Sequence, residues 1–245
     1  METEGKMNPV EVNYQKDHPA IPTYQKESME QVENKKEMFF YFAQTIAGEI
    51  PFETHLDVGC GSGYMVSGMR RMGKKSFGIE IGHMYHSGLF PEVKDFVIER
   101  DIFKMNALSD RYDLVSAIEV LEHLYAENFS RTDLNNGIIN LIDRSNKFIL
   151  ITVPILTLDY CPWLDWNGRD PKIWPRILRT NEVPLNSDGT PILGHVTLAT
   201  EAWWRCKLES FGLYRMKEAE DNINETLKRV DPGLLEWWHV FLYSK

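Results

Sequence analysis

Five consecutive residues, Glu119 to His123 (EVLEH), place three ionisable side chains directly after the apolar run YDLVSAI. Such a cluster can do two kinds of chemistry. His123 could take a proton from an acceptor hydroxyl, because an imidazole titrates near neutral pH. Alternatively, Glu119, Glu122 and His123 could bind a divalent cation that acidifies the hydroxyl. That second chemistry needs a further ligand from elsewhere in the chain, and His195 is the candidate.

A third interpretation assigns EVLEH no chemistry. If a helix begins at Glu119, the side chains of Glu119, Glu122 and His123 share one helix face, because they stand at i, i+3 and i+4. Glu122 and His123 would then form a salt-bridged helix turn, and His195 would brace a loop. From the residues alone, the catalytic base, the cation site and the structural turn all remain open.

The elements around EVLEH follow an alternating pattern. Short apolar runs are separated by amphipathic stretches, which predicts βαβ units and a parallel sheet. Strands are expected at HLDVGC, SFGIEIG, within DFVIERDI, at YDLVSAIEV and at NKFILITVP. A helix from about Glu27 to Ile50 precedes them, SGYMVSGMRRMG forms a helix that ends at Gly73, and EVLEH begins a helical stretch.

The second half of the chain is less regular. Residues 155–194 hold three tryptophans and five prolines without a clear period, and a segment of this length is typically a lid or binding loop. Downstream we predict a helix at TEAWWRCKLESFG, a strand at LYRMKEAE, a loop at DNINETLKRVDPGLLE and a final strand at WWHVFLYSK. The last two strands would form an antiparallel hairpin at one sheet edge. Residues 1–27 are predicted to be a polar arm, and residues 28–245 a single domain.

A glycine-rich loop, LDVGCGSG at residues 56–63, lies between the first predicted strand and its helix. Glycines allow the backbone to approach a ligand closely, and the carboxyl edge of a parallel sheet is where nucleotides bind. The GxGxG spacing lacks the Lys-Ser/Thr ending of a phosphate-binding P-loop. Glu80 ends the second strand, where a carboxylate can bind ribose hydroxyls, and Asp101 follows the third, where it could reach an adenine amino group.

In this order, LDVGCGSG, GIEIG, ERDI, YDLVSAIEVLEHL and FILITVP resemble the class I S-adenosylmethionine-dependent methyltransferases. The resemblance implies a methyltransferase with an α/β, Rossmann-like fold: a seven-stranded, mostly parallel sheet with helices on both faces and an antiparallel last strand. It implies S-adenosyl-L-methionine as the cofactor. The cofactor-binding residues that it implies are Asp57, Gly59, Cys60, Gly61 and Gly63 at the methionine part, Glu80 at the ribose, Ile81, Asp101 and Ile102 at the adenine, and Glu119 beside the sulfonium.

Narrower resemblances concern the acceptor. Glu-x-x-Glu-His followed by a later histidine is similar to the Mg²⁺-type site of small-RNA 3′-end 2′-O-methyltransferases, and EVLEH is also similar to ubiquinone-pathway O-methyltransferases. This resemblance implies that Mg²⁺ or Mn²⁺, with Zn²⁺ also compatible, is bound by Glu119, Glu122, His123 and His195. GHVTLATEAWWRCKLESFG loosely resembles bacterial glycan-associated methyltransferases.

We therefore expect O-methylation of a small-molecule or sugar hydroxyl, activated by His123 with Glu119 and Glu122, and an acceptor lid at residues 155–194. The alternatives are RNA 2′-O-methylation and a cofactor-binding, inactive partner subunit. The formal net charge of −9 and the lack of a long basic stripe disfavour nucleic acid as the acceptor.

The composition sets the remaining limits. Three cysteines without CxxC spacing disfavour a disulfide framework and a thiolate zinc site. No apolar stretch approaches the roughly 20 residues that cross a bilayer, and the N-terminus does not have the pattern of a secretory signal. A cytoplasmic protein is the expectation, and the sequence gives no oligomeric state.

Overall fold

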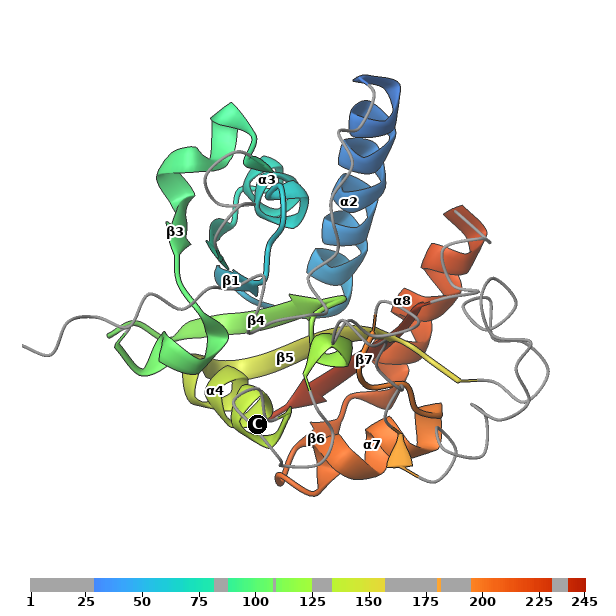
Figure 1. Ribbon diagram of the computed structural model, residues 1–245. Helices are drawn as coiled ribbons and strands as arrows, with labels where there is room; N and C mark the ends of the chain where they lie inside the picture. Colours follow the sequence, from blue (N-terminus) through green and yellow to red (C-terminus); the bar gives the residue numbers. More distant parts are fainter. Residues whose placement is uncertain are drawn as a thin grey trace, which may run out of the picture.

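In a computed structural model, the chain folds around a seven-stranded sheet with the order β3-β2-β1-β4-β5-β7-β6 (Figure 1). The structure describes residues 29–81, 88–107, 109–124, 134–156, 180–181, 195–230 and 238–245. The predicted arm at 1–27 lies outside these residues, and so does the predicted lid at 155–194 apart from residues 155–156 and 180–181. The strands are β1 (Thr54–Val58), β2 (Lys75–Glu80), β3 (Val97–Glu99), β4 (Tyr112–Ile118), β5 (Ser145–Pro154), β6 (Tyr214–Arg215) and β7 (Trp238–Ser244).

The strand directions confirm the predicted fold class. β3, β2, β1, β4 and β5 pair in parallel, whereas β7 runs antiparallel to both β5 and β6. From β1 the chain proceeds outward through β2 and β3, and β4 then returns to the other side of β1. The order therefore reverses between β1 and β4, and ligands of such sheets bind at the carboxyl ends of the two strands where it reverses.

Helices cover both faces of the sheet. The α-helices are α2 (Met29–Glu49), α3 (Tyr64–Arg71), α4 (Leu134–Arg144), α7 (Glu201–Glu209) and α8 (Lys217–Val230), and the 3₁₀ helices are η2 (Pro91–Phe96), η3 (Ile102–Ala107) and η4 (Leu121–His123). One apolar core joins the sheet to α4 and α7, and a second joins its other face to α2, α3 and α8. Figure 1 shows α2 and α3 on one side of the sheet and α4 and α7 on the other.

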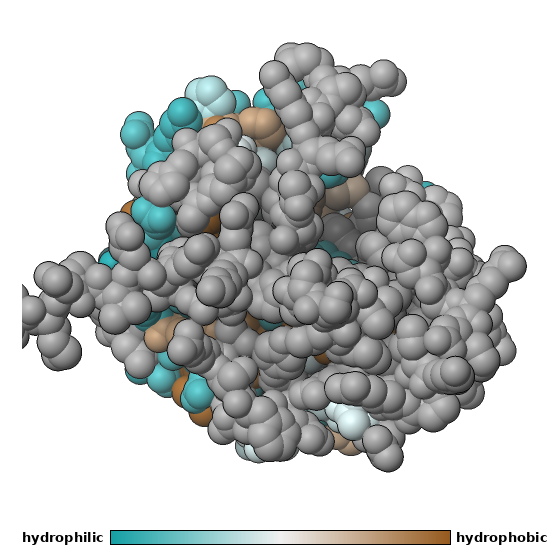
Figure 2. All heavy atoms as spheres, in the orientation of Figure 1, coloured by the Kyte–Doolittle hydropathy of each residue, from teal (hydrophilic) through white to brown (hydrophobic). Residues whose placement is uncertain are grey.

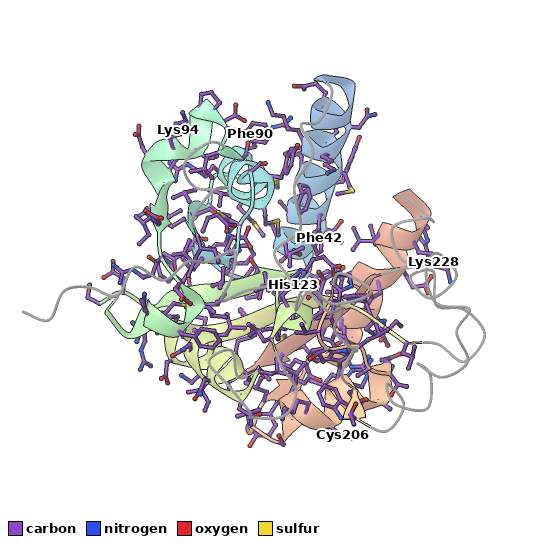
Figure 3. The ribbon with its side chains drawn as sticks, in the orientation of Figure 1. Phe42, Phe90, Lys94, His123, Cys206 and Lys228 are labelled. Carbon is purple, nitrogen blue, oxygen red and sulfur yellow. The ribbon has the colours of Figure 1, made fainter. Side chains whose placement is uncertain are left out.

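Apolar spacing explains the first helix. Phe42, Ala43, Ile46 and Ile50 recur at helical intervals, as predicted, and are all buried in the second core. Each large apolar side chain buried in this way contributes about 1.5 to 3 kcal/mol. Phe42 lies at the foot of α2, close to the sheet (Figure 3). On the outer surface, hydrophilic side chains gather over η2, where Lys94 points outward (Figures 2 and 3).

Two predictions near the C-terminus are wrong. LYRMKEAE is a strand only at Tyr214–Arg215, and α8 begins at Lys217. The stretch predicted as the loop DNINETLKRVDPGLLE is helical as far as Val230. Ile223 and Leu227 drive this helix, because they pack into the core beside α2. Within the described part of the chain, no helix is long and apolar enough to cross a membrane.

Candidate functional site

The glycine loop and the EVLEH turn are in direct contact where the strand order reverses. The loop follows β1, and EVLEH follows β4, its parallel neighbour. Gly59 has a φ of 70°, and a Cβ added there would lie 2.6 Å from Cγ2 of Val120. Any other residue at position 59 would therefore be strained and would push the EVLEH turn away. The two motifs singled out in the sequence form one site.

The loop has room for a ligand at its centre. Gly61 has a φ of 55°, and a Cβ built there would meet no atom within 4 Å. The backbone N–H of Gly61 donates to Oε2 of Glu80 at 2.5 Å, and the N–H of Ile81 donates to Oε1 at 2.8 Å. Burial raises the pKa of the Glu80 carboxyl, and these two hydrogen bonds act against the rise. Glu80 thus joins the end of β2 to the glycine loop.

The other predicted cofactor-binding carboxylates lie at the same end of the sheet. Asp57 is almost fully buried and accepts a hydrogen bond from the Ser116 hydroxyl at 2.5 Å. Oδ1 of Asp101 accepts from the N–H of Phe103 at 2.9 Å, which fixes the turn that contains Ile102. Hydrogen bonds hold the loop against the carboxyl end of β2: the N–H groups of Gly59 and Cys60 donate to the carbonyl of Ile79, and that of Gly61 donates to Glu80. The contacts of these residues with a cofactor remain a prediction.

The EVLEH turn differs from the helix start that was predicted. Glu119 has a φ of 55°, which is outside the helical range, and the helical part is limited to η4, residues 121–123. The statement that Glu119, Glu122 and His123 share one helix face is therefore wrong. The backbone N–H of Glu119 donates to the carbonyl of Thr152 at 3.1 Å and approaches its hydroxyl at 3.2 Å. That hydroxyl in turn donates to Oε1 of Glu119 at 3.1 Å.

Three of the four predicted cation ligands come together. Oε1 of Glu122 lies 3.9 Å from Nε2 of His123 and 4.0 Å from Nε2 of His195. One possible ligand atom from each of the three residues lies within 4.8 Å of the other two. The two imidazole rings are 5.1 Å apart between centroids. Figure 3 shows His123 near the middle of the molecule, and it belongs to the turn that follows β4.

Glu122 is the unusual member of this group. Its side chain has no exposed surface, and neither carboxyl oxygen accepts a hydrogen bond from an N–H or a hydroxyl that the structure describes. The group that shares a hydrogen bond with it is the buried Glu119 carboxyl. Nδ1 of His123 is likewise buried without a hydrogen-bond partner among the described residues. Buried polar atoms usually have a partner, so an exception of this kind calls for a physical explanation.

The site's electrostatics disfavour charge on every member. Burial, followed by the Glu119 carboxylate, raises the pKa of Glu122 well above its usual range. Burial raises the pKa of Glu119 to about 8. Burial, with His195 beside it, lowers the pKa of His123 to about 3, and burial lowers that of His195 to about 4. Both imidazoles are therefore neutral at pH 7, which is the form that binds metal ions.

His195 is held against the turn by backbone hydrogen bonds. The N–H groups of Val196 and Thr197 both donate to the carbonyl of Glu122, at 3.0 and 2.9 Å. The Thr197 hydroxyl donates to the carbonyl of Leu124 at 2.6 Å. These contacts bring a residue from far along the sequence to EVLEH, as the cation hypothesis required.

Sequence reasoning missed several residues that support the site, namely His55, Ser76, Ser116, Thr152 and Thr197. The first four are polar residues inside apolar strands and are fully buried. Parallel strands with both faces covered are expected to be apolar throughout. A polar residue in such a run was the signal that could have identified them.

Comparisons with known proteins agree with this arrangement. A family model described as a methyltransferase domain matches residues 21–129, the part that holds the glycine loop, Glu80, Asp101 and EVLEH. Residues 21–129 thus have the sequence of a methyltransferase domain, and they lie on a sheet with the strand order of class I methyltransferases. The same match and the class I sheet support S-adenosylmethionine as the methyl donor of the enzyme.

Solved structures of methyltransferases share its fold. Magnesium protoporphyrin IX methyltransferase (ChlM) from Synechocystis PCC 6803, with bound SAH, is 13% identical, with a TM-score of 0.55 over 96% of this chain and 95% of that one. An O-methyltransferase family protein from Burkholderia thailandensis is 12% identical, with a TM-score of 0.52 over 88% of this chain and 57% of that one. At these identities the likeness concerns the fold of the methyltransferase and leaves its acceptor open. No curated protein sequence matches the chain significantly.

Proposed function

We propose that this methyltransferase transfers the methyl group of S-adenosylmethionine to a hydroxyl of a small molecule or sugar, and that Glu122, His123 and His195 bind a divalent cation at that hydroxyl. The observation that carries the proposal is the completely buried Glu122 carboxylate, which has two neutral imidazoles beside it and accepts no hydrogen bond from a described N–H or hydroxyl. The contact between the glycine loop and EVLEH supports a cofactor site next to these ligands.

The donor set fits a cation better than it fits a lone catalytic base. A general base works best when its pKa is near the pH of the reaction, and burial lowers the pKa of His123 to about 3. Two ligands about 2.1 Å from one ion can be no more than about 4.2 Å apart. The distances of 3.9 and 4.0 Å from Glu122 to the imidazoles are within that limit. The three ligand atoms together lie within 4.8 Å of one another, so the two imidazoles would move closer together around a bound ion.

The identity of the ligands suggests which cation. One carboxylate and two imidazoles suit Mn²⁺ or Zn²⁺, whereas Mg²⁺ prefers oxygen ligands almost exclusively. When bound, such a cation would supply Lewis acidity that lowers the pKa of a coordinated hydroxyl. Glu119, held by Thr152 at the end of β4, would lie between this group and the methyl donor and would exclude water from the line of transfer.

The direct test measures cation binding and turnover separately. Full-length protein is stripped with EDTA, and Mn²⁺ binding is then followed by electron paramagnetic resonance for the wild type, His195→Gln and His239→Gln. His239 is the matched control, since it is a partly buried histidine that contacts Arg205 and Glu201 and does not belong to the group of Glu122, His123 and His195. We expect tight Mn²⁺ binding by the wild type and His239→Gln, and at least about tenfold weaker binding by His195→Gln.

Formation of S-adenosylhomocysteine is measured in parallel with hydroxylated sugars, phenols and short RNAs. Turnover should disappear on stripping and return with Mn²⁺ or Zn²⁺. Turnover that survives stripping would refute the cation, and turnover only with RNA would refute the small-molecule acceptor. Cofactor binding without turnover on any acceptor would favour an inactive partner subunit.

A further inference from the structure

A row of buried polar side chains crosses the face of the sheet that packs against α2 and α3. Nδ1 of His55 lies 2.8 Å from the Ser76 hydroxyl, and Nε2 of His55 lies 2.8 Å from the Ser116 hydroxyl. The Ser116 hydroxyl donates to Oδ1 of Asp57 at 2.5 Å. His55, Ser76 and Ser116 have no exposed surface, and Asp57 has 3%. The row thus joins β2, β1 and β4 and ends beneath the glycine loop.

Strand register explains why these side chains meet. His55 pairs with Ser76 and Asp57 pairs with Ser116, so each pair lies side by side on the same face. His55 and Asp57 are two residues apart on β1 and therefore point to that face as well. The same face otherwise carries the apolar core with Phe42 and Leu114, in which unpaired polar groups would be costly.

The hydrogen bonds all run in one direction when Asp57 is a carboxylate. Ser116 has one hydroxyl proton, and it is donated to Asp57, so its contact with His55 requires an N–H at Nε2 of His55. Burial lowers the pKa of His55 to about 3, so the ring is neutral and carries a single proton. Nδ1 is then an acceptor, and Ser76 is its donor. Every donor in the row points towards Asp57.

We propose that Ser76, His55 and Ser116 are positioning residues that keep the Ser116 hydroxyl aimed at Asp57, and so hold the Asp57 side chain as a carboxylate for the ammonium group of the cofactor. The proposal rests on the cofactor-binding role assigned to Asp57. It adds a function for three residues that do not reach the cofactor.

Few groups act on the charge of Asp57, and among them Glu80 opposes it. Glu80 at the end of β2 acts on it by charge repulsion, and the Cys60 thiol of the glycine loop lies close by. On α3, Arg70 donates to the backbone carbonyl of Ser76 at 3.0 Å and so binds β2 rather than Asp57. From α2 and β4, no charged side chain is among the causes that shift the pKa of Asp57.

The balance of these influences depends on Ser116. Burial raises the pKa of Asp57, the Ser116 hydrogen bond lowers it and Glu80 raises it, and together they bring it to about 7. A hydrogen bond to a charged group is worth about one to two pKa units. Without Ser116, Asp57 would therefore be protonated over more of the neutral range. The affinity for the cofactor is therefore present above the pKa of Asp57 and is lost as the pH falls through that pKa.

The test is the pH dependence of S-adenosylhomocysteine binding by the full-length protein, measured by calorimetry from about pH 5.5 to 8.5. Ser116→Ala should move the midpoint of the affinity change upward by about one pH unit, and Ser116→Thr, which keeps a hydroxyl, should leave it near the wild-type value. Ser76→Ala frees the choice of His55 tautomer and should cause a smaller shift in the same direction. It also provides the test if Ser116→Ala does not fold.

Methylthioadenosine is the control ligand, because it lacks the amino-acid part and its affinity should not follow the titration of Asp57. An unmoved midpoint in both alanine variants, with normal wild-type binding, would overturn the proposal and leave the proposed function intact. A wild type that binds S-adenosylhomocysteine at no pH would overturn the cofactor role of Asp57 and the proposed function with it.

Discussion

Glu122 and Glu220 are both glutamates without exposed surface, but their surroundings are opposite. Oε1 of Glu220 accepts from Arg205 at 2.8 Å and from Arg215 at 2.7 Å, and its Oε2 accepts from the N–H of Leu242 at 2.9 Å. For Glu122, the described part of the chain provides no N–H or hydroxyl donor to either oxygen, and its near neighbours are Glu119 and two neutral imidazoles.

This difference in surroundings assigns a structural role to Glu220 and a functional role to Glu122. The Glu220 cluster joins α7, β6, α8 and β7, and it contains the opposite charges that a buried carboxylate requires. At Glu122, no described cation of the chain neutralises the carboxylate. The Glu122 carboxyl instead shares a hydrogen bond with the Glu119 carboxyl. A buried pair of acids without a positive charge is destabilising, so its presence beside the glycine loop favours a cation from outside the chain.

The largest expected effect is on activity at EVLEH. Glu122→Gln should lower methyl transfer by about 100-fold or more, because it removes the proposed carboxylate ligand. The free energy of unfolding should stay the same or rise by about 1 kcal/mol, because no favourable ion pair is lost. Steady-state kinetics and urea unfolding measure the two quantities. A variant that loses stability but retains turnover would assign Glu122 to the fold.

The same substitution at the other glutamate should have the opposite result. Glu220→Gln leaves Arg205 and Arg215 without their shared carboxylate, and breaking a buried ion pair of this kind costs about 3 kcal/mol. Turnover per folded molecule should be unchanged below the melting temperature. The measurement is again urea unfolding, with activity assayed under conditions where the variant is folded. If folded Glu220→Gln had no turnover, the assignment of a purely structural role to Glu220 would be wrong.

A smaller effect is expected at the residue that positions Glu119. Thr152→Val removes the hydroxyl that holds both the N–H and the carboxyl of Glu119, and should lower kcat by about tenfold with little change in KM for the cofactor. Thr152→Ser keeps the hydroxyl and should restore kcat. A loss of activity that serine does not restore would point to packing rather than to this hydrogen bond.

Local sequence predicted much of this architecture. The glycine loop, the five parallel strands and the antiparallel β7 follow from apolar runs and turn residues within short stretches. The helix proposed to begin at Glu119 failed because Thr152, on another strand, fixes Glu119 in a left-handed conformation. The residues next to Glu119 in the sequence do not indicate that contact.

The missed helix α8 has a different cause. Its buried face consists of Glu220, Ile223 and Leu227, which are spaced as in a helix. The first of these positions holds a charged residue, so the apolar period is weak. Two arginines from α7 and β6 make that glutamate acceptable in the core. A sequence pattern cannot show such pairing. Both the helix and its charge cluster were therefore missed.

The hydrogen bonds from Val196 and Thr197 to the Glu122 carbonyl also bear on the order in which the site is made. During synthesis, the glycine loop, Glu80, Asp101 and EVLEH all leave the ribosome before His195 does. On our proposal, a nascent chain long enough to contain every cofactor-binding residue still lacks a cation ligand. The part of the enzyme that activates the acceptor is thus the last to be assembled.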